Sequence, residues 1–361
     1  PRIRRTPPHL YLGCFFVGLM VLSVTYSAYP QYALVRAGQM CVLLGLTMVA
    51  AHKATRADLH WFAHGYIALI AVSVVYGVFV HSTPITKLQA GRFTWLAIHP
   101  TVSGVLTGLA ALLAAGYLAA KPRSRPGPVW SRAAYASALV IVGRGALASQ
   151  TRGAVAGCLV GIVVLLLALR GGRAIIELQV ILVVVGIAVA LLAGGRVVDY
   201  FARGETSAQI STLNSRTEVW ATARTAIAHK PMFGYGVTAS RGLFYDTLNL
   251  GGGHNAAVNV FVELGMVGLA AWLALLIALV FGIRRIPIKA FPGLRVDRAL
   301  LLGVITFLLI DGVFYEGLGA TTNVASTWFF VCIAWLSVAR RDTGDETPGE
   351  PAKLRVNGVP Q

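Results

Sequence analysis

A short polar group stands at the start of a long apolar segment in the second half of the chain. His254, Asn255, Asn259 and Glu263 belong to the stretch GGGHNAAVNVFVELGMVG, and the last three are spaced by four residues. A helix that starts at His254 therefore carries them on one face. Polar groups in an apolar helix face a bundle interior or a wet cavity rather than lipid. The pattern predicts a polar site here, although hydrogen bonding between helices would explain the two asparagines and the glutamate equally well.

The histidine of this group has the properties of a general base. The positive end of a helix dipole disfavours a charged imidazole, so His254 should be neutral near pH 7 and able to accept a proton. The glycines at 251–253 allow this loop to approach other groups closely or to move. The simpler alternative is an interfacial histidine without a task.

Four arginines stand where a charge is expensive. Arg144 lies inside an apolar segment, Arg152 opens the next one, Arg36 lies near a segment end, and Arg216 begins a predicted loop helix. A guanidinium group binds phosphate through two parallel hydrogen bonds and keeps its charge at physiological pH. We expect Arg152 and Arg216 to act in catalysis and Arg144 and Arg36 to bind substrate. Extension toward lipid headgroups is the alternative, and for Arg36 it is the favoured one.

Other histidines are weaker candidates. His81 lies at the outer end of an apolar segment and is expected to line the entrance to the site, where it and Asn255 would bind substrate. His99 reads as a polar contact within the core. His52 and His60 fall on predicted loops of the opposite side.

Two carboxylates and the cysteines complete the set of groups considered. Asp311 and Glu316, in LLIDGVFYEGLGA, could orient a histidine or pair with an arginine, and pairing with an arginine is favoured. The four cysteines are far apart and inside apolar segments, which predicts packing rather than a disulfide or zinc site. The sequence contains no P-loop, HExxH or Asp-x-Asp motif, so we expect no cofactor and no metal.

The elements that must position these residues are membrane-spanning helices. The 361-residue chain is 56% hydrophobic and only 12% charged, against roughly 25% charged residues in soluble domains. Segments long enough to span a bilayer predict an all-α polytopic membrane protein with ten spans, at 10–29, 34–51, 62–80, 95–120, 133–149, 153–169, 174–194, 254–282, 299–314 and 322–338.

The distribution of positive charge sets the orientation. With the N-terminus inside, 20 of the 31 Lys and Arg residues fall on inner segments, as the positive-inside rule requires. The net charge of +17 is therefore mostly topological, and a nucleic-acid partner is not expected. The polar groups described above then lie near the outer membrane face.

The chain divides into four predicted parts. Spans fill 1–194, an outer loop occupies 195–253, further spans fill 254–338, and a polar tail covers 339–361. Because the chain begins with Pro1 rather than methionine, we expect missing N-terminal residues.

The outer loop contains one clear helical pattern. Apolar residues recur at helical spacing over 215–229, with Ser215 as a plausible cap and Glu218 three residues later. Pro231 should end this helix.

Three stretches together resemble a known family. SQTRGAVAGCLVG, NSRTEVWATARTAIAHKPMFGYGV and HNAAVNVFVELGMVGLAAWLALL, between about 149 and 276, are similar to the shared region of the O-antigen ligase and O-antigen polymerase superfamily. The ten residues between His254 and Gly265 resemble the spacing of the ligase branch. Trp220 departs from that branch, in which leucine usually lies four residues after the loop arginine.

The resemblance implies a GT-C-type helical bundle, with about twelve spans in full-length members. It implies transfer of a glycan from undecaprenyl pyrophosphate to a sugar hydroxyl of the lipid A–core, on the periplasmic side of the bacterial inner membrane. Arginines would stabilise the leaving pyrophosphate without a metal, and His254 would take the acceptor proton, with inversion at the anomeric carbon.

Several alternatives stay open. An O-antigen polymerase would use the same chemistry with a growing glycan as acceptor. A pilin-type protein O-oligosaccharyltransferase would often carry a larger C-terminal part outside the membrane. A transporter with an outer anion site belongs to another class, and it should show an inverted repeat and polar groups accessible from both faces.

Overall fold

The computed structural model shows a bundle of long helices. It describes residues 7–80, 91–96, 98–121, 126–170, 195, 200, 216–248, 251–320 and 322–345. The N-terminal half of the bundle contains α1 (Pro8–Ser23), η1 (Val24–Tyr26), α2 (Pro30–Lys53), α3 (Arg56–Phe79), α4 (Pro100–Ala119), α5 (Arg132–Ala148) and α6 (Arg152–Leu169). The C-terminal half contains α9 (Arg216–His229), α10 (Ala239–Leu248), α11 (Ala256–Arg284), η4 (Pro292–Leu294), α12 (Arg295–Phe314), α13 (Gly317–Ala320) and α14 (Val324–Asp345).

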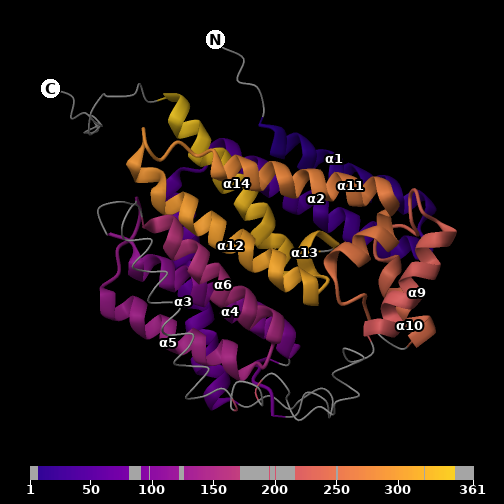
Figure 1. Ribbon diagram of the computed structural model, residues 1–361, viewed down its shortest axis with the longest axis horizontal. Helices are drawn as coiled ribbons and strands as arrows, with labels where there is room; N and C mark the ends of the chain where they lie inside the picture. The colour runs from indigo at the N-terminus through magenta and orange to yellow at the C-terminus, as the bar shows by residue number, and fades with distance from the viewer. Residues whose placement is uncertain are drawn as a thin grey trace.

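The helical membrane architecture predicted from the sequence is confirmed. Within the described residues there is no strand, and six helices are long and apolar enough to cross a membrane: α1 with η1, α2, α3, α4, α6 and α11. Helices α5, α12 and α14 occupy three further predicted spans. The predicted span 174–194 lies outside the described residues. Figure 1 shows the long helices side by side, with α9 and α10 gathered at the right-hand end.

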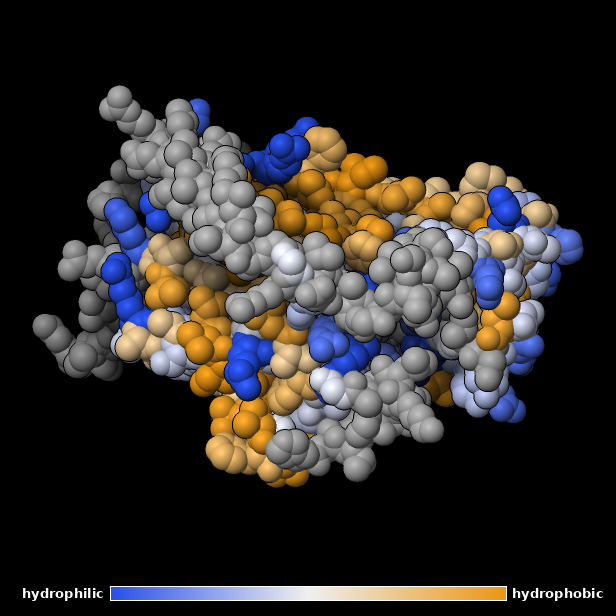
Figure 2. Space-filling view, turned by 60° about the horizontal axis from the view of Figure 1, so that its bottom comes forward, coloured by the Kyte–Doolittle hydropathy of each residue, from blue (hydrophilic) through white to orange (hydrophobic). Residues whose placement is uncertain are grey.

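The helices differ in how much of their surface is covered. In α4, 78% of the residues in the most apolar 18-residue stretch are buried, whereas the share in α2 is only 22%. Helix α2 exposes large apolar side chains such as Leu34, Val42 and Leu46. An apolar helix with an exposed apolar face suits a lipid environment. On the face in Figure 2, hydrophobic side chains cover much of the middle, and hydrophilic ones mark the two ends and a smaller group near the centre.

Small residues pack α6 tightly against α12. A Cβ atom on Gly157 would lie 2.9 Å from the carbonyl oxygen of Phe307, and one on Gly161 would lie 2.9 Å from that of Gly303. Such glycines let two membrane helices approach closely. The two helices run antiparallel, so the start of α6 lies beside the end of α12.

Helix α11 is broken at Gly265, where we expected an uninterrupted span. Gly265 has φ 66°, and a Cβ there would lie 2.3 Å from Met232, so only glycine fits. The segment 231–236 fills the break with four backbone hydrogen bonds: Tyr235 N to Val262 O, Gly236 N to Glu263 O, Met266 N to Pro231 O, and Val267 N to Met232 O. Irregular backbone at membrane depth is tolerated when protein satisfies its polar groups in this way.

The predicted loop helix is confirmed as α9. Its apolar side, with Val219 and Ala223, packs against Phe244 of α10 and Val262 of α11 in a small separate core. The helix ends at His229, two residues before Pro231, which was predicted to end it, and Ser215 lies outside the described residues. The loop helix is thereby fixed over the start of α11.

Two predictions about helix ends, at the ends of the bundle that were predicted to lie inside, were wrong or incomplete. His52 and His60 were expected in loops, but His52 lies in the last turn of α2 and His60 is buried within α3, because both helices extend beyond their apolar cores. Helix α14 continues to Asp345, past the predicted span end at 338.

Candidate functional site

The C-terminal end of α12 is where the predicted site residues meet. Asn255 Nδ2 donates to the carbonyl oxygen of Val313 at 3.1 Å, and Arg216 donates to that of Phe314 at 3.2 Å. The Arg216 guanidinium also lies 5.7 Å from the centre of the Phe314 ring. His254 Nδ1 lies 3.8 Å from Glu316 Oε2. Residues nearly 100 positions apart in sequence are thus joined at one point.

Arg152 reaches the same end through the packing of α6. It is the first residue of α6, and a Cβ on the next residue, Gly153, would lie 2.9 Å from Phe314 Cβ and 3.2 Å from Asp311 Oδ1. Arg152 is half-buried. The close approach that Gly153 permits is therefore what brings Arg152 to the end of α12.

Arg92, which sequence reasoning did not select, fixes the turn before α6. Its Nε donates to Ser149 O at 2.9 Å and its NH2 to Thr151 Oγ1 at 3.2 Å. Within this turn Gln150 adopts φ 51°, an unfavourable value for a residue with a side chain. The arginine holds this strained turn in place.

His254 is held in a strained backbone conformation and a neutral state. Its φ is 48°, and its side chain is 38% exposed. Burial lowers the pKa of the imidazole below its usual value; Glu316 opposes this shift and Arg216 adds to it. Non-glycine residues with positive φ often mark functional sites. A neutral, accessible imidazole is suited to accept a proton.

The loop before His254 is anchored from both sides, so the structure shows close approach, which was one of the two roles expected for its glycines. Asn259 Oδ1 accepts a hydrogen bond from Gly253 N at 2.9 Å, and Trp220 Nε1 donates to Gly253 O at 3.2 Å. Gly252 packs against Glu316, where a Cβ would lie 2.6 Å from Oε1. Gly252 and Gly253 thus permit close approach, and Trp220, the departure from the ligase pattern, contacts Gly253.

The polar face of α11 has a supporting task. Asn255 caps the helix by accepting from Val258 N at 3.0 Å, and Glu263 accepts from Ser240 Oγ of α10 at 2.5 Å. Asn259 and Glu263 are buried. The polar residues of this helix, apart from His254, therefore bind neighbouring segments, which was the alternative that the spacing left open.

Two residues of the site were misjudged or missed by sequence reasoning. Glu316 was expected to pair with an arginine, but it faces His254, because the chain after Phe314 turns back over the start of α11. His99 caps α4 by accepting from Thr101 N at 3.2 Å. Burial and the charge of Arg92 lower the pKa of His99, which also interacts electrostatically with Glu316 and His254. Its position one residue before the Pro100 that opens α4 was the available signal.

Two predicted substrate-binding residues, Arg36 and Arg144, form no contact with this group of residues. Arg36 is half-buried on α2 and donates to Gln39 at 2.9 Å. Arg144 is exposed on α5, and no hydrogen bond joins it to another described residue. His81 lies outside the described residues. Within the part of the chain that the structure describes, no group of His, Cys, Asp or Glu is placed to hold a metal ion.

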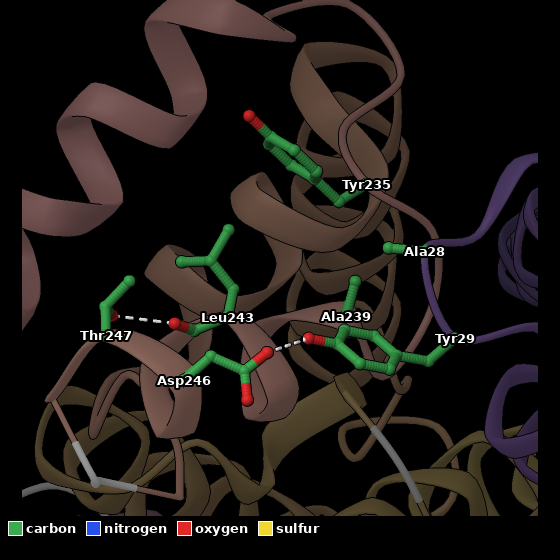
Figure 3. A pocket seen from close by; sticks show the side chains of 7 residues that line it. All are labelled: Ala28, Tyr29, Tyr235, Ala239, Leu243, Asp246 and Thr247. Atoms are coloured by element: carbon green, nitrogen blue, oxygen red, sulfur yellow. Dashed lines mark hydrogen bonds between the residues drawn. The ribbon is translucent and has the colours of Figure 1, made fainter.

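A cavity of about 280 Å³ lies on another side of α10. Figure 3 shows Tyr29, Tyr235 and Asp246 around it, with the Tyr29 hydroxyl donating to Asp246 Oδ2. Within α10, Ser240 contacts Glu263 and Phe244 approaches Gly253, whereas Leu243 and Asp246 line the cavity. One short helix thus separates this tyrosine pocket from the start of α11.

A comparison with protein families finds a match to the central part of the chain. Residues 136–273 match the model of a family described as O-antigen ligase. The matched region contains Arg144, Arg152, Arg216 and His254, and it ends before Glu316. A comparison with curated proteins finds no match.

Proposed function

We propose that this member of the O-antigen ligase and polymerase superfamily is an O-antigen ligase. It transfers a glycan from undecaprenyl pyrophosphate to a sugar hydroxyl of the lipid A–core. The reaction takes place at the periplasmic face of the bacterial inner membrane, within a GT-C-type helical bundle. The observation that carries the proposal is the meeting of Arg216, His254 and Glu316 at the end of α12, next to the start of α6 with Arg152.

The arginines bind the leaving group. Arg216 and Arg152 neutralise the charge that develops on the pyrophosphate as its bond to the anomeric carbon breaks. Their guanidinium groups bind phosphate oxygens in pairs, which also orients the donor. The donor is already activated by pyrophosphate, so the step needs neither ATP nor a sugar nucleotide.

His254 deprotonates the acceptor. Because Nδ1 faces Glu316, Nε2 is the nitrogen that accepts the proton from the acceptor hydroxyl. The oxygen then forms its bond to the anomeric carbon from the side opposite the pyrophosphate, with inversion. The separation of 3.8 Å is too long for a hydrogen bond, so we expect it to shorten when substrate binds. Glu316 would then stabilise the imidazolium.

We assign the tyrosine pocket to a sugar ring of the acceptor. Aromatic side chains with a few polar groups are typical of small-ligand sites, and Asp246 can accept from sugar hydroxyls. The thickness of one helix, on the order of 10 Å, separates this pocket from His254. That span suits an acceptor of two or three sugars.

O-antigen polymerase is the second candidate, since it belongs to the same superfamily and uses the same chemistry. The acceptor distinguishes the two. Purified protein is incubated with lipid-linked donor and either lipid A–core or a second donor molecule. A ligase modifies lipid A–core and leaves donor alone unchanged. A glycan ladder without lipid A–core contradicts the ligase proposal and supports the polymerase.

The transporter alternative is tested by the same preparation. A ligase in proteoliposomes forms a covalent product with lipid A–core on the membrane side that carries His254. Movement of the donor across the bilayer without a covalent product contradicts an enzymatic role.

A further inference from the structure

A second pocket lies among α1, α11 and α14, at the end of α11 far from His254. Its cavity of about 360 Å³ is lined by Pro8, His9, Ala278, Phe281, Gly282, Arg285 and Arg340. The volume falls in the range of roughly 300–1,000 Å³ that is common for small-molecule sites. In Figure 1 the end of α11 and the end of α14 lie toward the left, away from α9 and α10.

The floor of this pocket is fixed by buried contacts between helices. His9 is 1% exposed, and its Nε2 shares a hydrogen bond of 2.8 Å with Ser337 Oγ, which ties α1 to α14. Gly282 allows α11 to approach α14, because a Cβ there would lie 2.6 Å from Leu336 Cδ2. The pocket is therefore a built feature of the bundle.

The two arginines of the pocket have no acidic partner among the described residues. Arg285 lies 6.0 Å from the ring of Phe281, and neither Arg285 nor Arg340 forms an ion pair there. The neighbouring Arg341, in contrast, donates to the carbonyl oxygens of Ala51, His52 and Ala54 at the end of α2. Arg341 thus serves the fold, whereas Arg285 and Arg340 leave two guanidinium groups for an anion.

The apolar side of the pocket indicates that this anion carries a hydrocarbon chain. Phe281 is 53% exposed on the outer surface of α11, and Ala278 continues that surface along the helix. Basic pockets between helix ends on the cytoplasmic side commonly bind lipid headgroups. The predicted topology puts this end of α11 on the cytoplasmic side.

We propose that this pocket binds the headgroup of an anionic phospholipid. Arg285 and Arg340 hold the phosphate, and Phe281 and Ala278 lie along the acyl chain. The positive end of α1, which begins at Pro8, adds to the attraction for an anion. Such a lipid would join α1, α11 and α14 at this end, so it would hold the helix that carries the catalytic segment at its other end.

The test measures lipid binding rather than glycan transfer. Protein in detergent is titrated with phosphatidylglycerol, and the bound lipid is counted by native mass spectrometry. Each arginine near a charged lipid surface contributes roughly fivefold in affinity. The double variant Arg285→Ala/Arg340→Ala is therefore expected to bind about 30-fold more weakly than the wild-type protein.

Arg284→Ala is the matched control, because Arg284 is an exposed neighbour on the same helix end but does not line the pocket. It should stay within about twofold of wild type. An equal loss in Arg284→Ala, or no loss in the double variant, would overturn the proposal in favour of diffuse surface attraction.

Two further probes identify the ligand. Phosphatidylcholine should bind at least tenfold more weakly than phosphatidylglycerol, and soluble glycerol phosphate should not compete at equal concentration. Equal binding of phosphatidylcholine would show a purely apolar site, and competition by glycerol phosphate would show a free phosphate site. If the double alanine variant does not fold, Arg285→Gln and Arg340→Gln are measured singly, each with an expected loss of about fivefold.

Discussion

The two ends of α12 carry similar chemical groups in opposite states. At its start, Asp297 accepts from Arg56 at 2.6 Å and from Trp335 Nε1 at 2.7 Å, and it lies 3.3 Å from His60. At its other end, Glu316 lies 3.8 Å from His254. The side chains of Asp297 and His60 are fully buried, whereas those of Glu316 and His254 are 12% and 38% exposed. Each end therefore combines a carboxylate, a histidine and an arginine.

The difference between them indicates what each is for. Both oxygens of the buried Asp297 carboxylate accept hydrogen bonds from side chains of other helices, which is typical of a structural network, although Nε2 of His60 has no hydrogen-bond partner among the described residues. Glu316 Oε2 has no hydrogen-bond partner among the described residues, and the histidine it faces is accessible. An incomplete network beside a cluster of positive charge is suited to receive a substrate. The comparison predicts that damage at the two ends will have different consequences.

The largest effect on turnover is expected from His254→Ala. Loss of a positioned general base costs about 10²–10⁴-fold in rate. Donor binding and folding should be kept, since the arginines bind the donor and the side chain is only half-buried. Turnover and donor binding are measured in the same preparation. If both disappear together, His254 is a pyrophosphate contact and not the base.

Damage at the start of α12 should lower the stability of the protein rather than its turnover. Asp297→Asn leaves Arg56 without its counter-charge, so the free energy of unfolding should fall by about 3–5 kcal/mol. Turnover per folded molecule should stay within about twofold of wild type. Denaturation by SDS measures the first quantity and an active-site titration normalises the second. A folded, stable variant that lacks activity would place Asp297 in the functional machinery.

The next largest effect on turnover is expected from substitution of Arg216 and Arg152. Arg216→Ala removes a group that stabilises developing charge, and a loss of about 10²–10³-fold in kcat is expected. Arg152→Lys keeps the charge but loses the paired hydrogen bonds, so a loss of at least about tenfold is expected. Arg144→Ala serves as a control, because Arg144 is exposed and lies within the matched region without joining the site. Full activity in both Arg216→Ala and Arg152→Lys would show that neither binds pyrophosphate.

The pH profile sharpens the comparison further. Because the pKa of His254 is lowered from about 6.5, its imidazole stays neutral as pH falls through 6.5, and kcat/KM should decrease only at lower pH. Glu316 raises this pKa, so Glu316→Gln should move the acid limb of the profile to still lower pH. An unchanged profile in Glu316→Gln would exclude an electrostatic contact between these two residues.

The smallest effect is expected in the tyrosine pocket. Tyr29→Ala removes one ring from the proposed sugar site, which should raise KM for the acceptor by about 2–10-fold with little change in kcat. Tyr32→Ala is the control. Tyr32 lies in the first turn of α2, which Tyr29 precedes; it is 69% exposed and does not line the pocket. A fall in kcat without a change in KM would remove the pocket from acceptor binding.

Much of the helical fold was predictable because bilayer physics leaves a clear pattern in sequence. A long apolar run such as the one after His254 has few alternatives to a membrane helix. Helix ends were less predictable. His60 was predicted to lie in a loop, because a polar side chain that finds a partner across the bundle looks, in sequence, like a solvent-exposed one.

The break in α11 shows the same limit inside a span. Gly265 lies in a long segment in which, apart from Asn259 and Glu263, the residues after Asn255 are apolar or glycine, so the composition favours an uninterrupted helix. The break exists because the segment 231–236 supplies partners for the exposed backbone groups, and that segment is some 30 residues earlier in the chain. Sequence periodicity does not register hydrogen bonds between distant segments.

For the site, the sequence by itself determined the residue types and their places at the starts of helices. The placement of His254 and Arg216 at the heads of two helices, and of Arg152 at the head of a third, follows from local capping and hydropathy. These are short-range effects, and a single chain displays them directly.

Only the tertiary structure decided which of these residues share a site. The close packing of α6 on α12 brings Arg152 to Phe314, and the turn after α12 brings Glu316 to His254. Arg36 instead binds Gln39 on α2, and Arg144 is exposed on α5. The physical reason is that the hydropathy of an apolar helix does not specify its rotation or its neighbours. Those are set by interdigitation of small and large side chains across the bundle, at contacts between residues far apart in sequence.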